Sequence, residues 1–315
     1  MASAETNAVL ETHALTKRFG SVVAVDALSL RVPRGGVFGL LGPNGSGKTT
    51  TIAMLLGLIR PSSGSLSLFG EQGTTPSQDA LRRTGSVIEA PAFYPHLSGR
   101  ANLRFFQGIG NRGAATDVDR LLELVGLADR AESKYHTYSL GMKQRVGIAC
   151  ALLGEPELVF LDEPTNGLDP AGIVDVRALI KRLGAGGRTI VLSSHQLHEV
   201  EEVCDSVAII GNGRLITQGR VQELLKRPES WRINTTNDAV AQRVIGGVRG
   251  VAEVKMVDGH IVAQVLPDLN GELSRALAEA GVYVILMEPI QVTLEDFFLE
   301  VTKDSGLRTR LEAIP

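Results

Sequence analysis

A glycine-rich segment near the N-terminus has the composition of a phosphate-binding loop. It fits the pattern G-x-x-x-x-G-K-[ST] in full and reads Gly42-Pro43-Asn44-Gly45-Ser46-Gly47-Lys48-Thr49. The glycines allow successive backbone N–H groups to face phosphate oxygens, and the helix that follows adds the positive end of its dipole. Lys48 would reach the β- and γ-phosphates, the Thr49 hydroxyl would ligate Mg²⁺, and Thr50 completes the expected site. The segment therefore predicts that the chain binds a nucleotide.

A pair of carboxylates follows an apolar run later in the chain. Residues 158–161 are continuously apolar, as in a buried strand, and Asp162 and Glu163 come directly after them. Asp162 is placed to hold Mg²⁺ through its water shell, and Glu163 to polarise an attacking water. An acidic pair at a strand end is by itself usually a solvated turn, but the phosphate-binding loop favours the catalytic interpretation. We therefore expect phosphoryl-transfer chemistry at these two residues.

The elements that would position these groups follow a strand–helix rhythm. The expected strands are 9–15, 22–32, 37–41, 158–161, 189–193 and 206–210, and the expected helices are 49–58, 173–183 and 197–204. Strands that alternate with helices favour a parallel sheet with helices on its faces. The sequence therefore predicts an α/β fold with a P-loop NTPase-type parallel-sheet core in residues 1–225.

Two regions depart from that rhythm. Residues from about 71 to 145 contain helical patterns at 100–107 and 117–125, which predicts an inserted helical subdomain. Residues 226–315 follow the order strand–helix–strand–strand–helix–strand, with the hairpin signal Asp258-Gly259 between the middle strands. That order predicts a small α+β accessory domain with a ferredoxin-like split βαβ.

Composition excludes several classes of protein. The 315 residues contain 32 Lys+Arg and 35 Asp+Glu, a net charge of −3, so the basic excess of nucleic-acid-binding domains is missing and no nucleic-acid partner is expected. Cys150 and Cys204 are expected to be reduced thiols in a cytosolic protein. We expect no signal peptide, and no stretch approaches the roughly 20 apolar residues that span a bilayer. Work at a membrane would therefore need another chain to recruit this one.

Three further segments complete a set of motifs. They are Tyr138-Ser139-Leu140-Gly141-Met142-Lys143-Gln144-Arg145, Asn166-Gly167-Leu168-Asp169-Pro170 and Ser193-Ser194-His195. With these motifs in this order, the chain resembles the ATP-binding subunit of ABC transporters over about residues 8–225. The short signature and Glu89 are similar to those of the bacterial multidrug and peptide-antibiotic export group. The same is true of the tail, Pro289 and Leu294-Glu295-Asp296-Phe297-Phe298-Leu299.

The resemblance implies ATP and Mg²⁺ as ligands and roles for individual residues. Phe19 matches the aromatic residue that stacks on adenine, with an ordinary core phenylalanine as the alternative. His195 matches the switch histidine that contacts the γ-phosphate, so it joins Glu163 and Lys48 as a catalytic residue. Glu89 stands where the family usually has Gln. Its carboxylate can still hold Mg²⁺, and a solvated loop residue with a coupling role is the alternative.

The resemblance also implies a second subunit. Ser139 and Gly141 match the signature that closes over the ATP of the opposite subunit, and Asp169 matches the loop that crosses the dimer interface. The family signature is usually Leu-Ser-Gly-Gly-Gln, and three of its five positions differ here. Because the chain has one copy of each motif, we expect a head-to-tail homodimer with two equivalent ATP sites.

The function that the resemblance implies is that of an ATP-hydrolysing motor. It would export a drug, an antibiotic peptide or a similar compound through a separate integral membrane permease, from the cytoplasm at the inner face of the cell membrane. The segment Pro91–Leu103 is the candidate groove for the permease, with a plain packed loop as the alternative. Two other functions stay open, a soluble ABC ATPase that remodels ribosomes or DNA and a protein that sequesters an antibiotic without transport.

Overall fold

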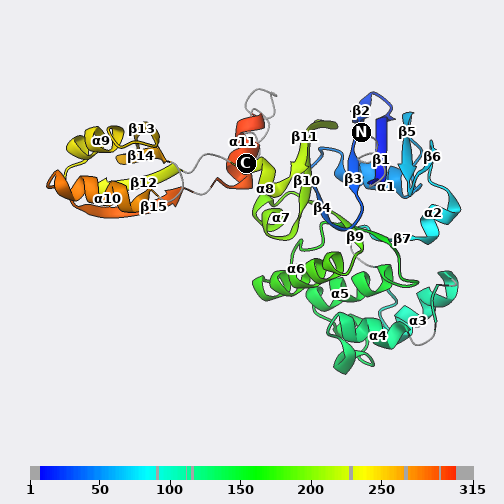
Figure 1. Cartoon of the computed structure of the whole chain (residues 1–315). Coiled ribbons are helices and arrows are strands. Elements are labelled where there is room, and N and C mark those ends of the chain that lie inside the picture. Colours follow the sequence, from blue (N-terminus) through cyan, green and yellow to red (C-terminus); the bar gives the residue numbers. More distant parts are fainter. Residues whose placement is uncertain are drawn as a thin grey trace. The chain divides into compact units, whose positions relative to one another are not determined.

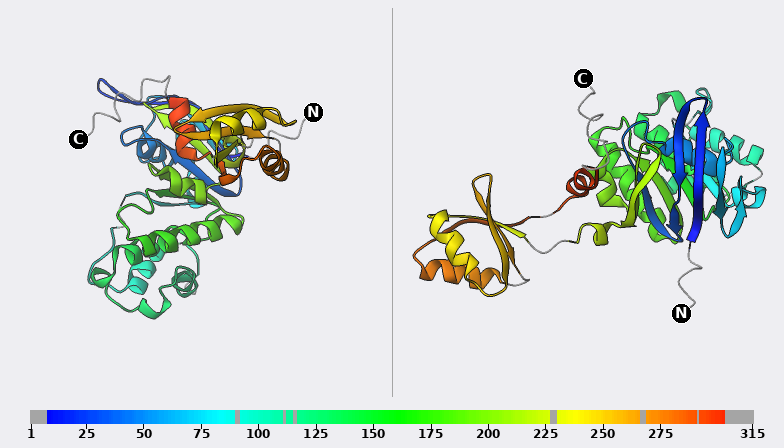
Figure 2. Two further views of the ribbon diagram at one scale, coloured as in Figure 1. Left: turned by 90° about the vertical axis from the view of Figure 1, so that its left-hand side faces the viewer. Right: turned by 90° about the horizontal axis from the view of Figure 1, so that it is seen from above.

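The structure is a computed structural model and describes residues 8–89, 92–110, 112–114, 117–226, 230–265, 269–290 and 292–302. It divides the chain into two compact units, whose elements are shown in Figures 1 and 2. The first contains the described residues up to Gln222 and those from Phe298 to Thr302, and the second is Glu223–Phe297. Among the described helices, none has the length and apolar character needed to span a bilayer.

A six-stranded sheet forms the centre of the first unit. Its order is β11-β10-β4-β9-β8-β7, with β4 (Gly36–Leu41), β7 (Thr84–Val87), β8 (Leu158–Asp162), β9 (Thr189–Ser194), β10 (Ser206–Gly211) and β11 (Arg214–Arg220). Neighbouring strands are parallel except for β11, which is antiparallel to β10. Helices α1 (Lys48–Leu55), α6 (Pro170–Ala185) and α7 (Leu197–Val203) follow β4, β8 and β9. The expected α/β fold with a parallel-sheet core is confirmed.

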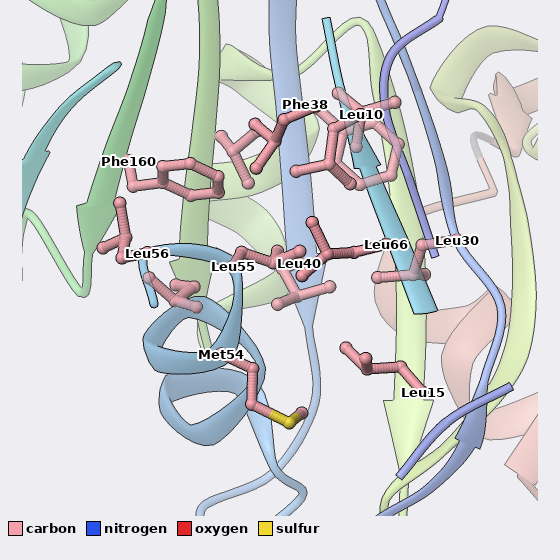
Figure 3. Close-up of a cluster of buried hydrophobic side chains, with 14 of the residues drawn as sticks. Leu10, Leu15, Leu30, Phe38, Leu40, Met54, Leu55, Leu56, Leu66 and Phe160 are labelled. Atoms are coloured by element: carbon pink, nitrogen blue, oxygen red, sulfur yellow. The ribbon is translucent and has the colours of Figure 1, made fainter. Parts of the chain in front are cut away.

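A second sheet shares an apolar core with the first. It contains β1 (Ala8–Phe19), β2 (Val22–Leu28), β3 (Arg31–Pro33), β5 (Ser63–Leu68) and β6 (Glu71–Gly73), all paired antiparallel. Leu10 and Leu66 of this sheet join Phe38 and Phe160 of the central sheet and Leu55 of α1 in one buried cluster, shown in Figure 3. Burial of each such side chain contributes about 1.5–3 kcal/mol. The core therefore anchors α1, and with it the loop that precedes this helix.

The helical insert begins later than about residue 71, where the sequence predicts its start, but its helices form close to the expected positions 100–107 and 117–125. They are α3 (Gly99–Gly110), α4 (Asp117–Leu124) and α5 (Leu140–Ala151), which lie at the lower end of the first unit in Figure 1. Residues 71–87, expected within the insert, instead supply β6, α2 (Gln78–Arg82) and β7. β7 belongs to the central sheet, where Thr84 pairs with Leu158 of β8. A strand this short, with a mixed composition, has too little periodicity to be recognised in the sequence.

The second unit is a four-stranded antiparallel sheet with two helices. In chain order its elements are β12 (Ser230–Thr235), α9 (Asp238–Gly246), β13 (Val251–Val257), β14 (His260–Val265), α10 (Asn270–Glu279) and β15 (Val284–Ile290). The strand order β13-β14-β12-β15 is the connectivity of a split βαβ unit. The helices pack on one face of the sheet through Ala241, Ile245, Leu273, Leu277, Ile233 and Ile261.

The end of the chain departs from the expected domain boundary. Helix α11 (Leu294–Thr302) begins after Thr293, whose hydroxyl donates to Asp296 (2.7 Å) and accepts from the Asp296 N–H (3.2 Å). The described residues from Phe298 to Thr302 group with the first unit, whereas the sequence predicts an accessory domain over residues 226–315. Another short helix, α8 (Val221–Leu224), contains the boundary between the units. A single short helix with apolar residues can complete either of two units, so its sequence cannot reveal which one it joins.

Candidate nucleotide-binding site

A cleft of about 520 Å³ opens beside the phosphate-binding loop. Its lining consists of Phe19, Ala24, Asn44, Gly45, Gly47, Lys48, Thr49, Thr50, Glu163, Asn166 and His195. Apart from Ala24 and Asn166, each of these belongs to the site that the sequence predicts. The loop follows β4, Glu163 follows β8 and His195 follows β9. The cleft therefore lies at the carboxyl ends of three parallel strands, where α/β sheets bind their ligands.

Two glycines of the loop have no room for a side chain. A Cβ on Gly42 would lie 2.3 Å from the carbonyl oxygen of Ile210, and one on Gly47 would lie 2.5 Å from that of Ala24. Gly47 also has a φ of 100°, a left-handed conformation that favours glycine. Beyond the loop, the first N–H groups of α1 have no partner within the helix and can face an anion.

Lys48 is held inside the loop. Its side chain is 6% exposed, and Nζ donates to the carbonyl oxygens of Gly42 (2.8 Å) and Pro43 (3.4 Å). The same Nζ lies 3.5 Å from Oε1 of Glu163. Nearby in the loop, Oγ of Ser46 is buried and has no hydrogen-bond partner among the described residues. A buried cation and an unpartnered hydroxyl suit a ligand rich in acceptor oxygens, so these residues fit a nucleotide phosphate.

Thr49 and Asp162 meet at the edge of the loop. The Thr49 hydroxyl donates to Oδ2 of Asp162 (2.9 Å), and the hydroxyl of Ser193 donates to Oδ1 of the same carboxylate. Asp162 is buried, and β8 and β9 place it opposite Ser193 in the sheet. A hydroxyl beside a carboxylate oxygen is a donor set of the kind that Mg²⁺ prefers. Two of the three residues predicted to hold the metal, Thr49 and Asp162, are therefore neighbours in the fold.

Glu163 and His195 form a hydrogen-bonded pair across the cleft. Nδ1 of His195 lies 2.8 Å from Oε2 of Glu163. The backbone of Glu163 is left-handed, with φ 47°, and its N–H donates to the Ser193 hydroxyl (3.0 Å). One carboxylate thus has an imidazole at one oxygen and the Lys48 ammonium near the other. This arrangement fixes where a proton acceptor would face a bound phosphate.

Other predicted residues lie outside this cleft. Ser139 caps α5 by accepting from the Met142 N–H (3.2 Å), and Asp169 caps α6 by accepting from the Gly172 N–H (3.2 Å). Neither they nor Gly141 line the cleft, and the contact of all three with the ATP of an opposite subunit stays a prediction. Glu89 is exposed, with a left-handed φ of 56°, and does not line the cleft either, so its contact with Mg²⁺ also stays a prediction.

Three residues of the site are not among the predicted site residues: Ala24, and Asn166 and Ser193, which stand in two of the quoted motifs without an assigned role. Ala24 and Asn166 line the cleft, and the Asn166 N–H donates to the carbonyl oxygen of Glu163 (3.1 Å). Ser193 bridges Asp162 and Glu163 but appears in the sequence only as a neighbour of His195. The register of β8 and β9 would have revealed Ser193, since it lies directly opposite Asp162.

Sheet, loop and cleft together define a P-loop nucleoside triphosphatase. A parallel sheet supports a glycine-rich loop that opens a helix, and a lysine and carboxylates gather at the ends of its strands.

Comparison with known proteins shows to which family of P-loop nucleoside triphosphatases the chain is similar. The family model described as ABC transporter matches residues 25–166. The bacitracin transport ATP-binding protein of Bacillus licheniformis is 40% identical over 93% of this chain and 97% of its own length. The daunorubicin resistance ATP-binding protein of Streptomyces coeruleorubidus is 35% identical over 91% of this chain and 94% of its own length. A solved ATP-binding subunit of an ABC transporter is 32% identical, with a TM-score of 0.61 over 69% of this chain and 91% of that one.

The chain belongs to the ABC transporter family and is an ATP-binding subunit with ATPase activity.

Proposed function

We propose that the chain is the ATP-driven motor of an exporter for a drug or an antibiotic. The observation that supports this best is the Glu163 carboxylate, which lies between Nζ of Lys48 and the imidazole of His195 in a cleft that fits a nucleotide. The direction and cargo are inferred from relatives that are named for bacitracin transport and for daunorubicin resistance.

The residues of the cleft divide the reaction among them. Thr49 and Asp162 would hold Mg²⁺, which supplies positive charge against the phosphates. Lys48 neutralises the β- and γ-phosphates, and Glu163 accepts the proton of the attacking water. His195 orients the Glu163 carboxylate and reaches the γ-phosphate. Well-placed charges stabilise the transition state without further rearrangement.

Phe19 is proposed to hold the base. Its ring is 50% exposed and lines the cleft, whereas a core phenylalanine would be buried. The ammonium of Lys17 lies 4.9 Å from the ring centroid. An exposed aromatic face with a cation on it suits stacking with an adenine ring.

The proposed assembly is a head-to-tail homodimer. Ser139 and Gly141 lie at the N-terminus of α5, whose free N–H groups can face the γ-phosphate of an ATP held by the opposite subunit. Asp169, at the N-terminus of α6, would lie at the same interface. Each ATP then needs residues of two chains, and a two-fold axis closes the assembly.

The proposed permease contact lies on the helical insert. Tyr94 and Phe105 are 49% and 40% exposed, with ring centroids 4.8 Å apart, whereas Phe93 packs against Phe106 and Tyr135. These exposed rings lie in or beside the predicted groove Pro91–Leu103, of which Pro91 falls outside the described residues. An exposed aromatic pair suits an apolar helix of a membrane partner. This contact would place the chain at the inner face of the cell membrane.

The test is capture of partners from detergent-solubilised native membranes. Glu163→Gln serves as bait with ATP and Mg²⁺, and Glu163→Gln with Lys48→Ala is the control that should not close around ATP. A multi-helix membrane protein in near-equal amount is expected from the first bait. Ribosomal or DNA-repair proteins without any membrane protein would overturn the proposal.

The docking surface has its own test with the same bait. Tyr94→Ala with Phe105→Ala should reduce the recovered membrane protein, because the change removes the exposed rings. Val174→Ala, which alters a residue of α6 that is 57% exposed, is the matched control. Equal recovery with both variants would contradict the docking site.

A further inference from the structure

The segments after β8 and β9 are joined at two points. The first is the pair Glu163 and His195 in the cleft. The second lies inside the unit, where the hydroxyl of Thr165 donates to Oε2 of Glu199. Thr165 follows Glu163 by two positions, and Glu199 follows His195 by four. The buried pair therefore joins the same two segments that hold the exposed pair.

The Thr165–Glu199 pair lies in an apolar setting. Thr165 is 5% exposed and Glu199 is 8% exposed. Both line a small cavity with Ile180, Leu192 and Val200. Burial of a carboxylate costs free energy unless hydrogen bonds and nearby positive charge compensate it. The compensation visible here is the Thr165 hydroxyl and the N-terminal end of α7, in whose first turn Glu199 lies.

Another charged group borders this cavity. Arg177 of α6 lies in the cavity wall, and its guanidinium pairs with Oε2 of Glu202 at 2.7 Å. The Glu199 carboxylate accepts its hydrogen bond from the Thr165 hydroxyl. Removal of the Thr165 hydroxyl would therefore take away the partner that holds Glu199 toward the loop after β8.

Tight turns connect each end of the buried pair to the cleft. The Asn166 N–H donates to the carbonyl oxygen of Glu163 (3.1 Å), and the Leu168 N–H donates to that of Thr165 (3.2 Å). On the other segment, the Gln196 N–H donates to the Ser194 hydroxyl (2.9 Å). Such short hydrogen-bonded turns transmit a shift of one residue to its neighbours.

We propose that Thr165 and Glu199 are positioning residues that set the place of Glu163 relative to His195. Neither touches the nucleotide cleft, so they act through the Glu163 carboxylate. The inference rests on the proposed role of Glu163 as the proton acceptor. A misplacement of about 1 Å in a catalytic group can lower a rate by about 100-fold.

The first test replaces Thr165 by valine, which has the same shape without the hydroxyl. Thr165→Val should lower kcat for ATP by roughly 10- to 100-fold, while the affinity for trinitrophenyl-ATP changes less than about twofold, since the phosphate loop is untouched. Thr165→Ser keeps the donor and should restore most of the lost rate. Glu199→Leu should reproduce the loss, and the double variant should lose no more than either single one.

A matched control separates positioning from a general structural effect. Thr84 is also buried, and its hydroxyl donates to the Ala80 carbonyl oxygen (2.8 Å). Thr84 does not belong to the lining of the cleft. Thr84→Val should lower the melting temperature as much as Thr165→Val does and leave kcat within about twofold of the wild-type value. An equal fall of kcat in both variants would overturn the proposal.

Combining Thr165→Val with Glu163→Gln shows whether Thr165 and Glu199 act through Glu163. In Glu163→Gln, addition of Thr165→Val should leave the residual rate unchanged, because the group that the pair positions is already lost. A further fall of tenfold or more would overturn the proposal. If Glu163→Gln itself turned over at the wild-type rate, the proposed role of Glu163 would fail. A wild-type kcat in Thr165→Val with an inactive Glu163→Gln would refute only the positioning role.

Discussion

Glu163 has contacts that limit it to few roles. One carboxylate oxygen lies near Nζ of Lys48 and the other accepts from the imidazole of His195. Glu163→Gln keeps the size and an acceptor oxygen but cannot take up a proton, so ATP should bind as before. Turnover should fall by about 10²–10⁴-fold. The check is phosphate release beside a nucleotide titration, with Glu11→Gln on β1 as the control, and a wild-type rate would remove Glu163 from the base role.

The two cysteines should be unreactive in the folded chain. Burial raises the pKa of the Cys150 thiol to about 11 and also raises the pKa of the Cys204 thiol. Only the thiolate reacts, and its fraction falls about tenfold for each unit by which the pH lies below the pKa. At pH 8 a disulfide reagent should label the native chain slowly and both thiols quickly after unfolding in guanidinium. Rapid labelling of native protein at pH 8 would contradict the burial of these thiols.

At the scale of elements, close approach of β7 and α5 determines how the insert joins the sheet. A Cβ on Gly85 of β7 would lie 1.9 Å from the carbonyl oxygen of Ala151, the last residue of α5. Backbone cannot give way as a side chain can, so Gly85→Ala should destabilise the fold by about 1–3 kcal/mol or more. Gly108→Ala, in α3 with nothing within 4 Å, should be stabilising by up to about 1 kcal/mol. Urea denaturation followed by circular dichroism measures the free energy of unfolding of both variants. Equal denaturation midpoints for Gly85→Ala and Gly108→Ala would contradict the close packing of β7 against α5.

Elements also explain which parts of the molecule the sequence could predict. Lys48, Thr49 and Asp162 follow from local spacing, because each lies where a strand ends or a helix begins, and the structure places them together. Thr165 and Glu199 meet only through the pairing of β8 with β9, and no local pattern records that register. For the same reason the sequence does not predict β7, because this strand is defined by its pairing with β8, which lies far along the chain.

At the scale of the whole molecule, the proposed dimer uses Lys48 of one chain and Gly141 of the other at each ATP. Gly141 has room for a side chain, since the nearest atom to an added Cβ is the Gly172 Cα at 3.8 Å. Gly141→Asp places a carboxylate at the N-terminus of α5, which favours the helix but repels the γ-phosphate of the partner chain. Lys48→Ala loses charge-assisted hydrogen bonds to phosphate, which weakens nucleotide binding by roughly 10- to 100-fold.

These two variants test the dimer when they are mixed. Each alone should be inactive, and Gly141→Ala should stay active as the neutral control. In a mixed dimer, the site with Lys48 of one chain and Gly141 of the other is intact. Random pairing of equal amounts makes about half of the dimers mixed, each with one intact site of two, so about a quarter of the wild-type turnover should return. If both residues acted on an ATP within one chain, the mixture would stay as inactive as its components, and the head-to-tail arrangement would be wrong.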